Sequence, residues 1–203
     1  MSRRITPDEV QLDEAVFGPL TQSLRELIDV AIRSEAGGAD ALRAHELIKE
    51  ATALLSARLD PKPFGVPSTG DGEYLPWGNV AMGLRNAIAP PLIIQRDDTD
   101  RFATDLVLGA AYEGPPGQVH GGMCALVLDH LLGATAHRPG APAFTGTLTL
   151  RYVAPTPLGR LRAEAWIDRE ERGKTFAVGH MIDAQGVVTV QAEGVFIRPK
   201  VSA

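Results

Sequence analysis

The chain has 203 residues and a formal net charge of −5, from 20 basic and 25 acidic residues. This length fits one domain, or one domain with an appendage, and 44% apolar content suits a globular core. The acidic balance argues against a nucleic-acid-binding protein, which usually carries a basic face. The single cysteine, Cys124, excludes an internal disulfide, no apolar run has membrane length, and the charged N-terminus does not read as a signal peptide. We therefore expect a cytoplasmic protein with no membrane insertion.

The first part of the chain is predicted to be helical. Thr6-Pro7-Asp8-Glu9 can form a capping box with proline at the first helical position. Gly18-Pro19 is expected to kink or split this helix, and Gly37-Gly38 to end it. Asp40 is expected to cap a second helix, which stops before the linker or wrapping loop that we predict over residues 61–79.

From about residue 90 the apolar pattern favours strands. The expected strands are 92–94 and 102–108, joined around residues 97–100, and then 143–154, 160–169, 174–183 and 187–198 after an apolar helix at about 121–136. This order predicts an α+β fold in which one antiparallel sheet covers a buried helix. We place an N-terminal helical extension at 1–65 and the main domain at 66–203.

The most informative residue is Asp129, in the middle of the apolar helix. A carboxylate among leucines is costly to bury without a partner. The step Gly121-Gly122 at the start of the helix allows close approach of a ligand, and the free amides there favour an anion or an oxyanion. An acid and an oxyanion site in one short segment point to acyl chemistry.

The spacing of these groups predicts a site shared by two subunits. Gly122 and Asp129 lie on nearly the same face of the helix, roughly 10 Å apart along its axis. Two groups that act on one carbonyl must each come within about 3 Å of it or of an attacking water. We therefore expect a homodimer in which the amide of one subunit meets the acid of the other; pairing of dimers into a tetramer stays open.

His120-Gly121-Gly122 followed by Asp129 resembles the signature of PaaI-like acyl-CoA thioesterases of the hotdog fold. The resemblance covers about residues 75–203 and includes residues 112–117, 144–157, 172–175 and 192–196. It implies an antiparallel sheet wrapped around one long central helix. It also implies hydrolysis of an acyl-CoA thioester to a carboxylic acid and free coenzyme A.

The resemblance assigns the chemistry to the start and middle of the helix. Asp129 would be the general base for water or the direct nucleophile. The Gly122 amide, together with that of Gly121, would polarise the thioester carbonyl and hold the oxyanion. His120 would fix the turn and bond to the thioester region of the substrate.

The resemblance also implies roles for residues outside the helix. Thr145 would position the water, and Thr147, two residues on and expected on the same strand face, is the alternative. Val119, Gly121 and Thr147 would contact the substrate. Arg172 and Lys174 would bind the phosphates of coenzyme A.

The sequence predicts neither a cofactor nor a metal. His130 and His137 are seven residues apart, but no third ligand has suitable spacing. Gln118 precedes the glycine step without an assigned role. Four residues are candidates for lining an acyl channel: Trp77, Met123, Phe144 and Tyr152.

Two other functions compete with hydrolysis. A non-catalytic acyl-CoA-binding or sensor protein would keep the fold and the pocket without turnover. An acyl hydratase would need an acid and a histidine on one face, which the adjacent Asp129 and His130 do not supply.

Overall fold

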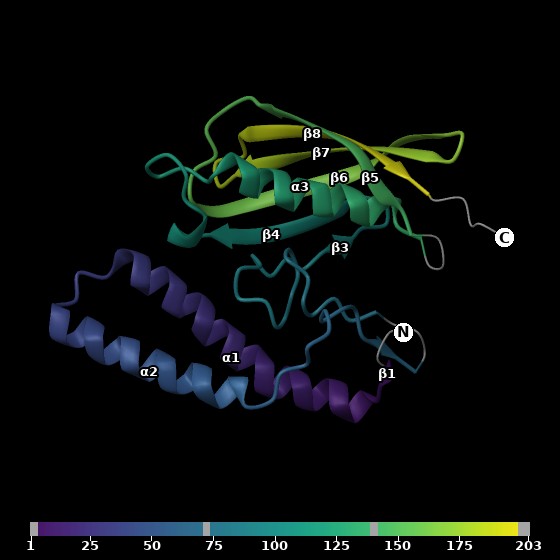
Figure 1. Ribbon diagram of the computed structural model, residues 1–203. Helices are drawn as coiled ribbons and strands as arrows, with labels where there is room; N and C mark the ends of the chain where they lie inside the picture. The colour runs from purple at the N-terminus through teal and green to yellow at the C-terminus, as the bar shows by residue number, and fades with distance from the viewer. Residues whose placement is uncertain (1–3, 71–73, 139–141, 199–203) are drawn as a thin grey trace.

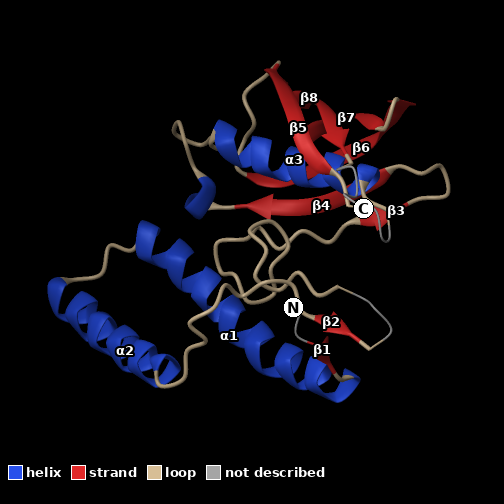
Figure 2. Cartoon of the chain, turned by 45° about the vertical axis from the view of Figure 1, so that its right-hand side comes forward, coloured by secondary structure: helices blue, strands red, loops and turns tan. Residues whose placement is uncertain are grey.

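A six-stranded antiparallel sheet wraps around one long helix in this computed structural model, which describes residues 4–70, 74–138 and 142–198 (Figures 1 and 2). The sheet order is β3-β4-β6-β7-β8-β5, and the helix is α3, Gly121–Ala136. The strands are β3 (Gln95–Arg96), β4 (Phe102–Leu108), β5 (Phe144–Tyr152), β6 (Gly159–Glu171), β7 (Lys174–Asp183) and β8 (Val188–Ile197). A short 3-10 helix, η1 (Ala110–Tyr112), follows β4. The predicted buried helix, the strand at 102–108 and the four later strands are confirmed.

The first predicted strand is misplaced. Residues 95–96, rather than 92–94, pair with the start of β4. Leu92 is buried in the main core, and its N–H donates to the carbonyl of Ala81 instead of to a strand. The run at 92–94 is therefore a loop that contributes Leu92 to the core and leaves Ile93 exposed.

The concave face of the sheet is lined by small residues beneath α3. Ala163 and Ala165 on β6, and Ala177 on β7, are at most 1% exposed. Gly179 on β7 and Gly194 on β8 lie so close to Leu132 of α3 that an added Cβ would meet its methyl groups at 3.0–3.1 Å. These small side chains let the helix sit deep in the curve of the sheet.

A bulge in β5 changes which side chains face the helix. Thr145 pairs with Phe196 and Thr147 with Val195, which leaves Gly146 as the extra residue. Thr145 therefore shares the helix-facing side of the sheet with the buried Phe196, and Thr147 lies on the opposite face. The expectation that the two threonines share a face is wrong, because strict alternation fails at a bulge.

The N-terminal segment forms two helices, α1 (Pro7–Arg33) and α2 (Gly38–Ser56), beside the β4 edge of the sheet (Figures 1 and 2). The capping box predicted at Thr6 and Glu9 is confirmed. Gly18-Pro19 does not split α1; Pro19 is exposed, so water can solvate the carbonyl that its ring leaves unpaired. Asp40 lies in the first turn of α2, whose N-cap is Gly37.

The segment between α2 and β3 packs against both parts of the chain. Leu75 and Trp77 are buried with Ile5 in a small cluster that includes the short parallel pair β1 (Arg4–Ile5) and β2 (Ser68–Thr69). Ala81 and Leu92 belong to the main core. Trp77 is thus a core residue of this second cluster rather than a wall of an acyl channel.

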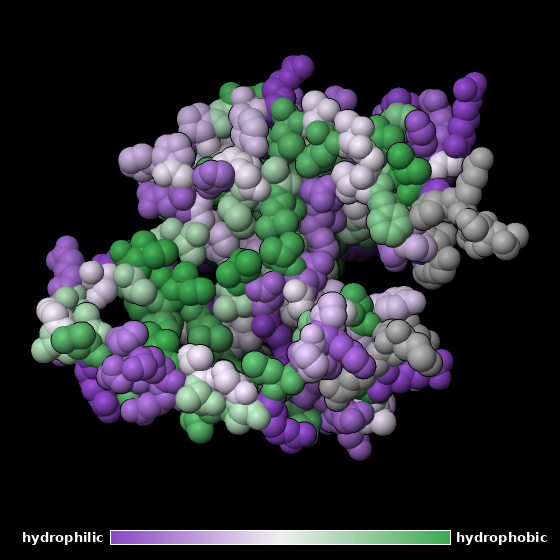
Figure 3. Space-filling view, in the orientation of Figure 1, coloured by the Kyte–Doolittle hydropathy of each residue, from purple (hydrophilic) through white to green (hydrophobic). Residues whose placement is uncertain are grey.

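Helix α2 buries none of its residues. Leucines such as Leu42 and Leu54 are exposed, and Figure 3 shows apolar side chains on the surface that the two helices present. In the three described ranges, no helix is long and apolar enough to cross a membrane.

The close approach of α3 to the sheet makes a stability prediction. The substitution Gly179→Ala places a Cβ 2.5 Å from the backbone oxygen of Glu164 and 3.1 Å from Leu132. We expect about 1–3 kcal/mol of destabilisation from this overpacking. Denaturant unfolding measures it, with Gly38→Ala as the control because open space surrounds that position. Equal stability of the two variants would show that the sheet relaxes freely beneath the helix.

Candidate active site

Asp129 is half-buried on α3, one turn before the buried Leu132. The hydroxyl of Thr145 donates a hydrogen bond to Asp129 Oδ1 over 3.0 Å. Within the described ranges, Asp129 forms no ion pair. The structure therefore brings together the acid and one of the two threonines that the sequence singled out, and it leaves the acid without a neutralising cation.

The turn before α3 is held by its own side chain. His120 is the N-cap, and its Nδ1 accepts the N–H of Gly122 over 3.0 Å. The His120 N–H donates to the carbonyl of Tyr112 over 2.9 Å. These bonds fix the histidine in place, and they leave Gly121 N–H without a partner among the described residues.

Tyr152, at the end of β5, covers the first residue of α3. Its hydroxyl donates to the carbonyl oxygen of Gly121 over 2.8 Å. A Cβ added to Gly121 would lie 3.2–3.3 Å from the hydroxyl and ring of Tyr152. The absence of a Cβ at position 121 therefore allows the close approach of this aromatic side chain.

Strand β5 connects the two halves of the candidate site. Its beginning, at Thr145, lies against Asp129, and its end, at Tyr152, lies against Gly121. Gly121 and Asp129 are eight residues apart on α3, a rise of about 12 Å. Within one chain, the acid and the free amide therefore stand apart at opposite ends of the same strand.

Val119 and Gln118 precede the turn. Val119 is 5% exposed, and its N–H donates to the carbonyl of Thr156, which ties the segment before the turn to the residues that follow β5. The side-chain oxygen of Gln118 is buried without a partner among the residues described.

The two cationic candidates lie at the other end of the helix. Arg172 and Lys174 are exposed at the β6–β7 turn, where Arg172 adopts a positive φ of 48°. The adjacent Glu170 accepts hydrogen bonds from Arg138, just beyond the C-terminus of α3. In one chain these cations are separated from the Gly121 turn by the length of α3, about 24 Å.

Burial shifts the titration of two side chains on α3. Desolvation raises the pKa of the Cys124 thiol, against the hydrogen bond with Thr156, which lowers it. Desolvation lowers the pKa of His130, although the neighbouring Asp129 charge acts in the opposite direction. Both shifts favour the neutral side chain.

No group of three or more His, Cys, Asp or Glu side chains in the described part of the chain is arranged to hold a metal ion. His130 and His137 belong to no such group.

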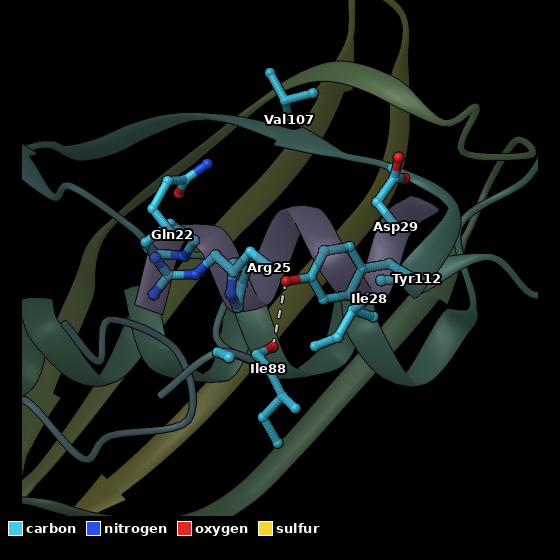
Figure 4. Close-up of a pocket in the computed structure, with 12 residues that line it drawn as sticks. Gln22, Arg25, Ile28, Asp29, Ile88, Val107 and Tyr112 are labelled. Carbon is cyan, nitrogen blue, oxygen red and sulfur yellow. Dashed lines mark hydrogen bonds between the residues drawn. The ribbon is translucent and has the colours of Figure 1, made fainter. Parts of the chain in front are cut away.

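A cavity of about 280 Å³ lies between α1 and the β4–η1 turn (Figure 4). Its walls are mainly apolar, and its polar groups are engaged within the protein. Arg25 donates to three backbone carbonyls, Asp29 accepts the Ala110 N–H, and the Tyr112 hydroxyl donates to the carbonyl of Ile88. Neither Asp129 nor Gly121 lines this cavity, so it is separate from the candidate site. The hydrogen bonds around it attach α1 to the rest of the chain.

Sequence reasoning placed Tyr152 only among four channel candidates. Its contact with Gly121 depends on β5 running alongside α3, which strand periodicity does not reveal. The sequence signal for this contact is the alternation along β5: Tyr152 follows Leu148 and Leu150 at steps of two residues, and so lies on the same helix-facing side.

The raised pKa of Cys124 makes a reactivity prediction. The thiol is 1% exposed, and a raised pKa keeps it protonated at pH 8, so it should be a poor nucleophile. We expect alkylation by iodoacetamide to be negligible in the folded protein and complete after denaturation. Mass spectrometry reads this directly, because the chain has one cysteine. Rapid labelling of the folded protein would contradict the packing around the first turns of α3.

Comparison with known proteins shows what part of this chain is similar to. Residues 116–190 match the family described as the Thioesterase superfamily. Human acyl-coenzyme A thioesterase THEM5 is 32% identical over 93 residues, 44% of this chain and 37% of that protein. The chain thus spans little more than a third of the length of this curated relative.

Solved structures share the fold. The crystal structure of a thioesterase superfamily protein is 29% identical, has a TM-score of 0.80 and covers 90% of each chain. That likeness extends beyond the sheet domain into the N-terminal helices. The PaaI protein of the E. coli phenylacetic acid degradation operon is 16% identical, with a TM-score of 0.51 over 55% of this chain and 81% of its own. At this identity, the likeness to the PaaI protein is one of fold alone.

Proposed function

We propose that the protein hydrolyses an acyl-CoA thioester to a carboxylic acid and free coenzyme A, because residues 116–190 match the Thioesterase superfamily and a 29% identical protein of that superfamily shares the fold over 90% of the chain. The human relative is named as an acyl-coenzyme A thioesterase, which supports this substrate class. The reaction consumes only the thioester and water, so it requires no cofactor.

The observation that carries the proposal is the environment of Asp129. A structural acid on an apolar helix is normally neutralised by a cation or by several backbone amides. Asp129 instead has the Thr145 hydroxyl at 3.0 Å and no ion pair among the described residues. A carboxylate held in place with free acceptor capacity is suited to take a proton from water or to attack a carbonyl.

The free amide of Gly121 is the oxyanion donor that this geometry favours. The Gly122 N–H, first expected in this role, already donates to His120 Nδ1. The Gly121 N–H stands at the first position of α3, where the helix dipole favours developing negative charge. His120 then acts by fixing the turn.

The proposed reaction has two routes that use the same groups. With Asp129 as base, the carboxylate removes a proton from water as the oxygen bonds to the thioester carbon, and the C–S bond then breaks to release the thiolate. With Asp129 as nucleophile, its oxygen bonds to that carbon, the thiolate leaves, and water hydrolyses the anhydride. In both, the Gly121 amide stabilises the carbonyl oxygen while it carries negative charge.

The separation of acid and amide implies two copies of the chain. An attacking group must lie within about 3 Å of a carbonyl bound at the amide, whereas the helical rise between Gly121 and Asp129 is about 12 Å. The composite site therefore uses the acid of one subunit and the amide of the other.

Strand β5 is suited to bring these groups together. It is an edge strand with one partner, β8, and both its end residues are more than half exposed. An unpaired edge of nine residues readily pairs with another copy. A two-fold axis close to Thr149 sets Leu148 opposite Leu150 of the partner subunit, both on the helix-facing side. With the bulge at Gly146, the same register brings Thr145 alongside the partner's Tyr152.

This register completes the proposed site. Thr145 holds Asp129, and Tyr152 holds Gly121, so pairing the strands places the acid of one subunit near the amide of the other. The exposed cations Arg172 and Lys174 remain available for the phosphates of coenzyme A.

Replacing the acid tests the reaction. We expect Asp129→Asn to lose about two orders of magnitude or more in kcat, because the amide neither takes a proton nor attacks the thioester. Thiol release from a panel of short, long and aromatic acyl-CoAs measures the loss. Asp98→Asn, on the exposed β3–β4 turn, is the matched control and should keep the wild-type rate.

The same panel separates hydrolysis from binding alone. Wild-type protein that acyl-CoA stabilises against heat without thiol release would be a binding protein or sensor. A fully active Asp129→Asn variant would remove the acid from the chemistry.

Mixing two inactive variants tests the shared site. Gly121→Val blocks the approach to the amide, and Asp129→Asn removes the acid, so each homodimer should be inactive. A heterodimer keeps one site with both groups intact, and random reassortment should restore about a quarter of wild-type activity. Absence of recovery, with heterodimers confirmed by native mass spectrometry, would place the site within one chain.

A further inference from the structure

The first two residues of α3 are glycines, so the backbone that carries the proposed donor is intrinsically flexible. Glycine has the softest backbone dihedrals of any residue, and Gly121 stands at the helix end, where intrahelical bonds do not hold its N–H. A donor aimed at an oxyanion contributes most when it is fixed in advance. Something outside the helix must therefore restrain this peptide.

Two contacts restrain the turn, and they act on different atoms. On one side, the backbone N–H of His120 donates to Tyr112, and the ring of His120 accepts the Gly122 N–H. On the other side, the Tyr152 hydroxyl donates to the carbonyl of Gly121 itself, over 2.8 Å. Tyr152 is thus the side chain, from outside the turn, that bonds directly to the residue carrying the free amide.

We propose that Tyr152 is a positioning residue for thioester hydrolysis, which holds Gly121 by its carbonyl so that the first turn of α3 directs the free Gly121 amide, on the preceding peptide, toward the carbonyl oxygen of the substrate. This inference rests on the function proposed above. The hydroxyl restrains the carbonyl of Gly121, and the ring packs at 3.3 Å from where a Cβ of residue 121 would lie. A side chain at position 121 would therefore crowd the tyrosine that holds this residue.

The chemistry of the phenol suits this task. Desolvation raises the pKa of Tyr152, so the hydroxyl stays protonated and remains a donor across the physiological range.

The variant Tyr152→Phe removes the hydroxyl and keeps the ring. We expect kcat to fall about three- to tenfold, the effect of one hydrogen bond, while KM stays unchanged. An S-alkyl thioether of coenzyme A has no carbonyl, so it should inhibit Tyr152→Phe and wild type equally. A structural role alone would not separate kcat from the affinity for this analogue.

Tyr74→Phe is the matched control, because Tyr74 is an exposed tyrosine that lies outside the candidate site. It loses the same hydroxyl group and should keep the wild-type kcat. A double-mutant cycle with Gly121→Ala adds a second readout: the added methyl displaces the tyrosine, so its cost should shrink in the Tyr152→Phe background.

The outcomes separate this proposal from the function it rests on. Unchanged kcat in Tyr152→Phe, or strictly additive effects in the cycle, would overturn the positioning role while wild-type turnover stands. Wild-type protein that releases no thiol from any acyl-CoA of the panel would remove the proposed function, and the positioning role with it.

Discussion

The depth at which α3 sits in the sheet is the constraint from which the rest of the structure follows. The curve of the sheet admits the helix only because alanine and glycine line its concave face, with Gly179 and Gly194 against Leu132. Larger side chains there would push the helix outward, since packed interiors do not compress. Buried on this side, α3 presents its remaining face, with Asp129, toward β5 and the sheet edge.

That placement explains why one strand carries so much of the site. β5 runs along the exposed flank of α3, so its helix-facing side chains reach the helix at both ends. The bulge at Gly146 is part of the arrangement, because without the extra residue Thr145 would face away from Asp129. A local irregularity of the strand thus sets the only hydrogen bond to the acid that the described residues provide.

Much of this architecture could be predicted from the sequence, because its signals are periodic. The bounds of α3 and of the last four strands follow from apolar spacing, and the capping box at Thr6 marks the start of α1. Sequence spacing did not reveal contacts that depend on three-dimensional register. The facing of Thr147 depends on a bulge, and the continuity of α1 through Pro19 depends on which side of the helix meets water.

The occupation of the Gly122 N–H illustrates the same limit at the site. Two consecutive glycines offer two amides, and their order in the chain does not say which one is free. The decision comes from a side chain two residues back, because the His120 ring accepts the second amide. The sequence therefore predicts the segment that we propose to hold an oxyanion, whereas the choice of amide depends on the hydrogen bonds of the turn.

The proposed site and the proposed interface are the same element, and this links association with catalysis. In the single chain, β5 is exposed along most of its length and is stabilised from one side only. Edge strands of this kind are among the least constrained parts of a sheet. Pairing with a second copy would restrain both Thr145, which donates to Asp129, and Tyr152, which donates to the carbonyl of Gly121. Dimerisation would therefore do more than bring the acid of one subunit to the amide of the other. It would also rigidify β5, the strand that contacts both Asp129 and Gly121.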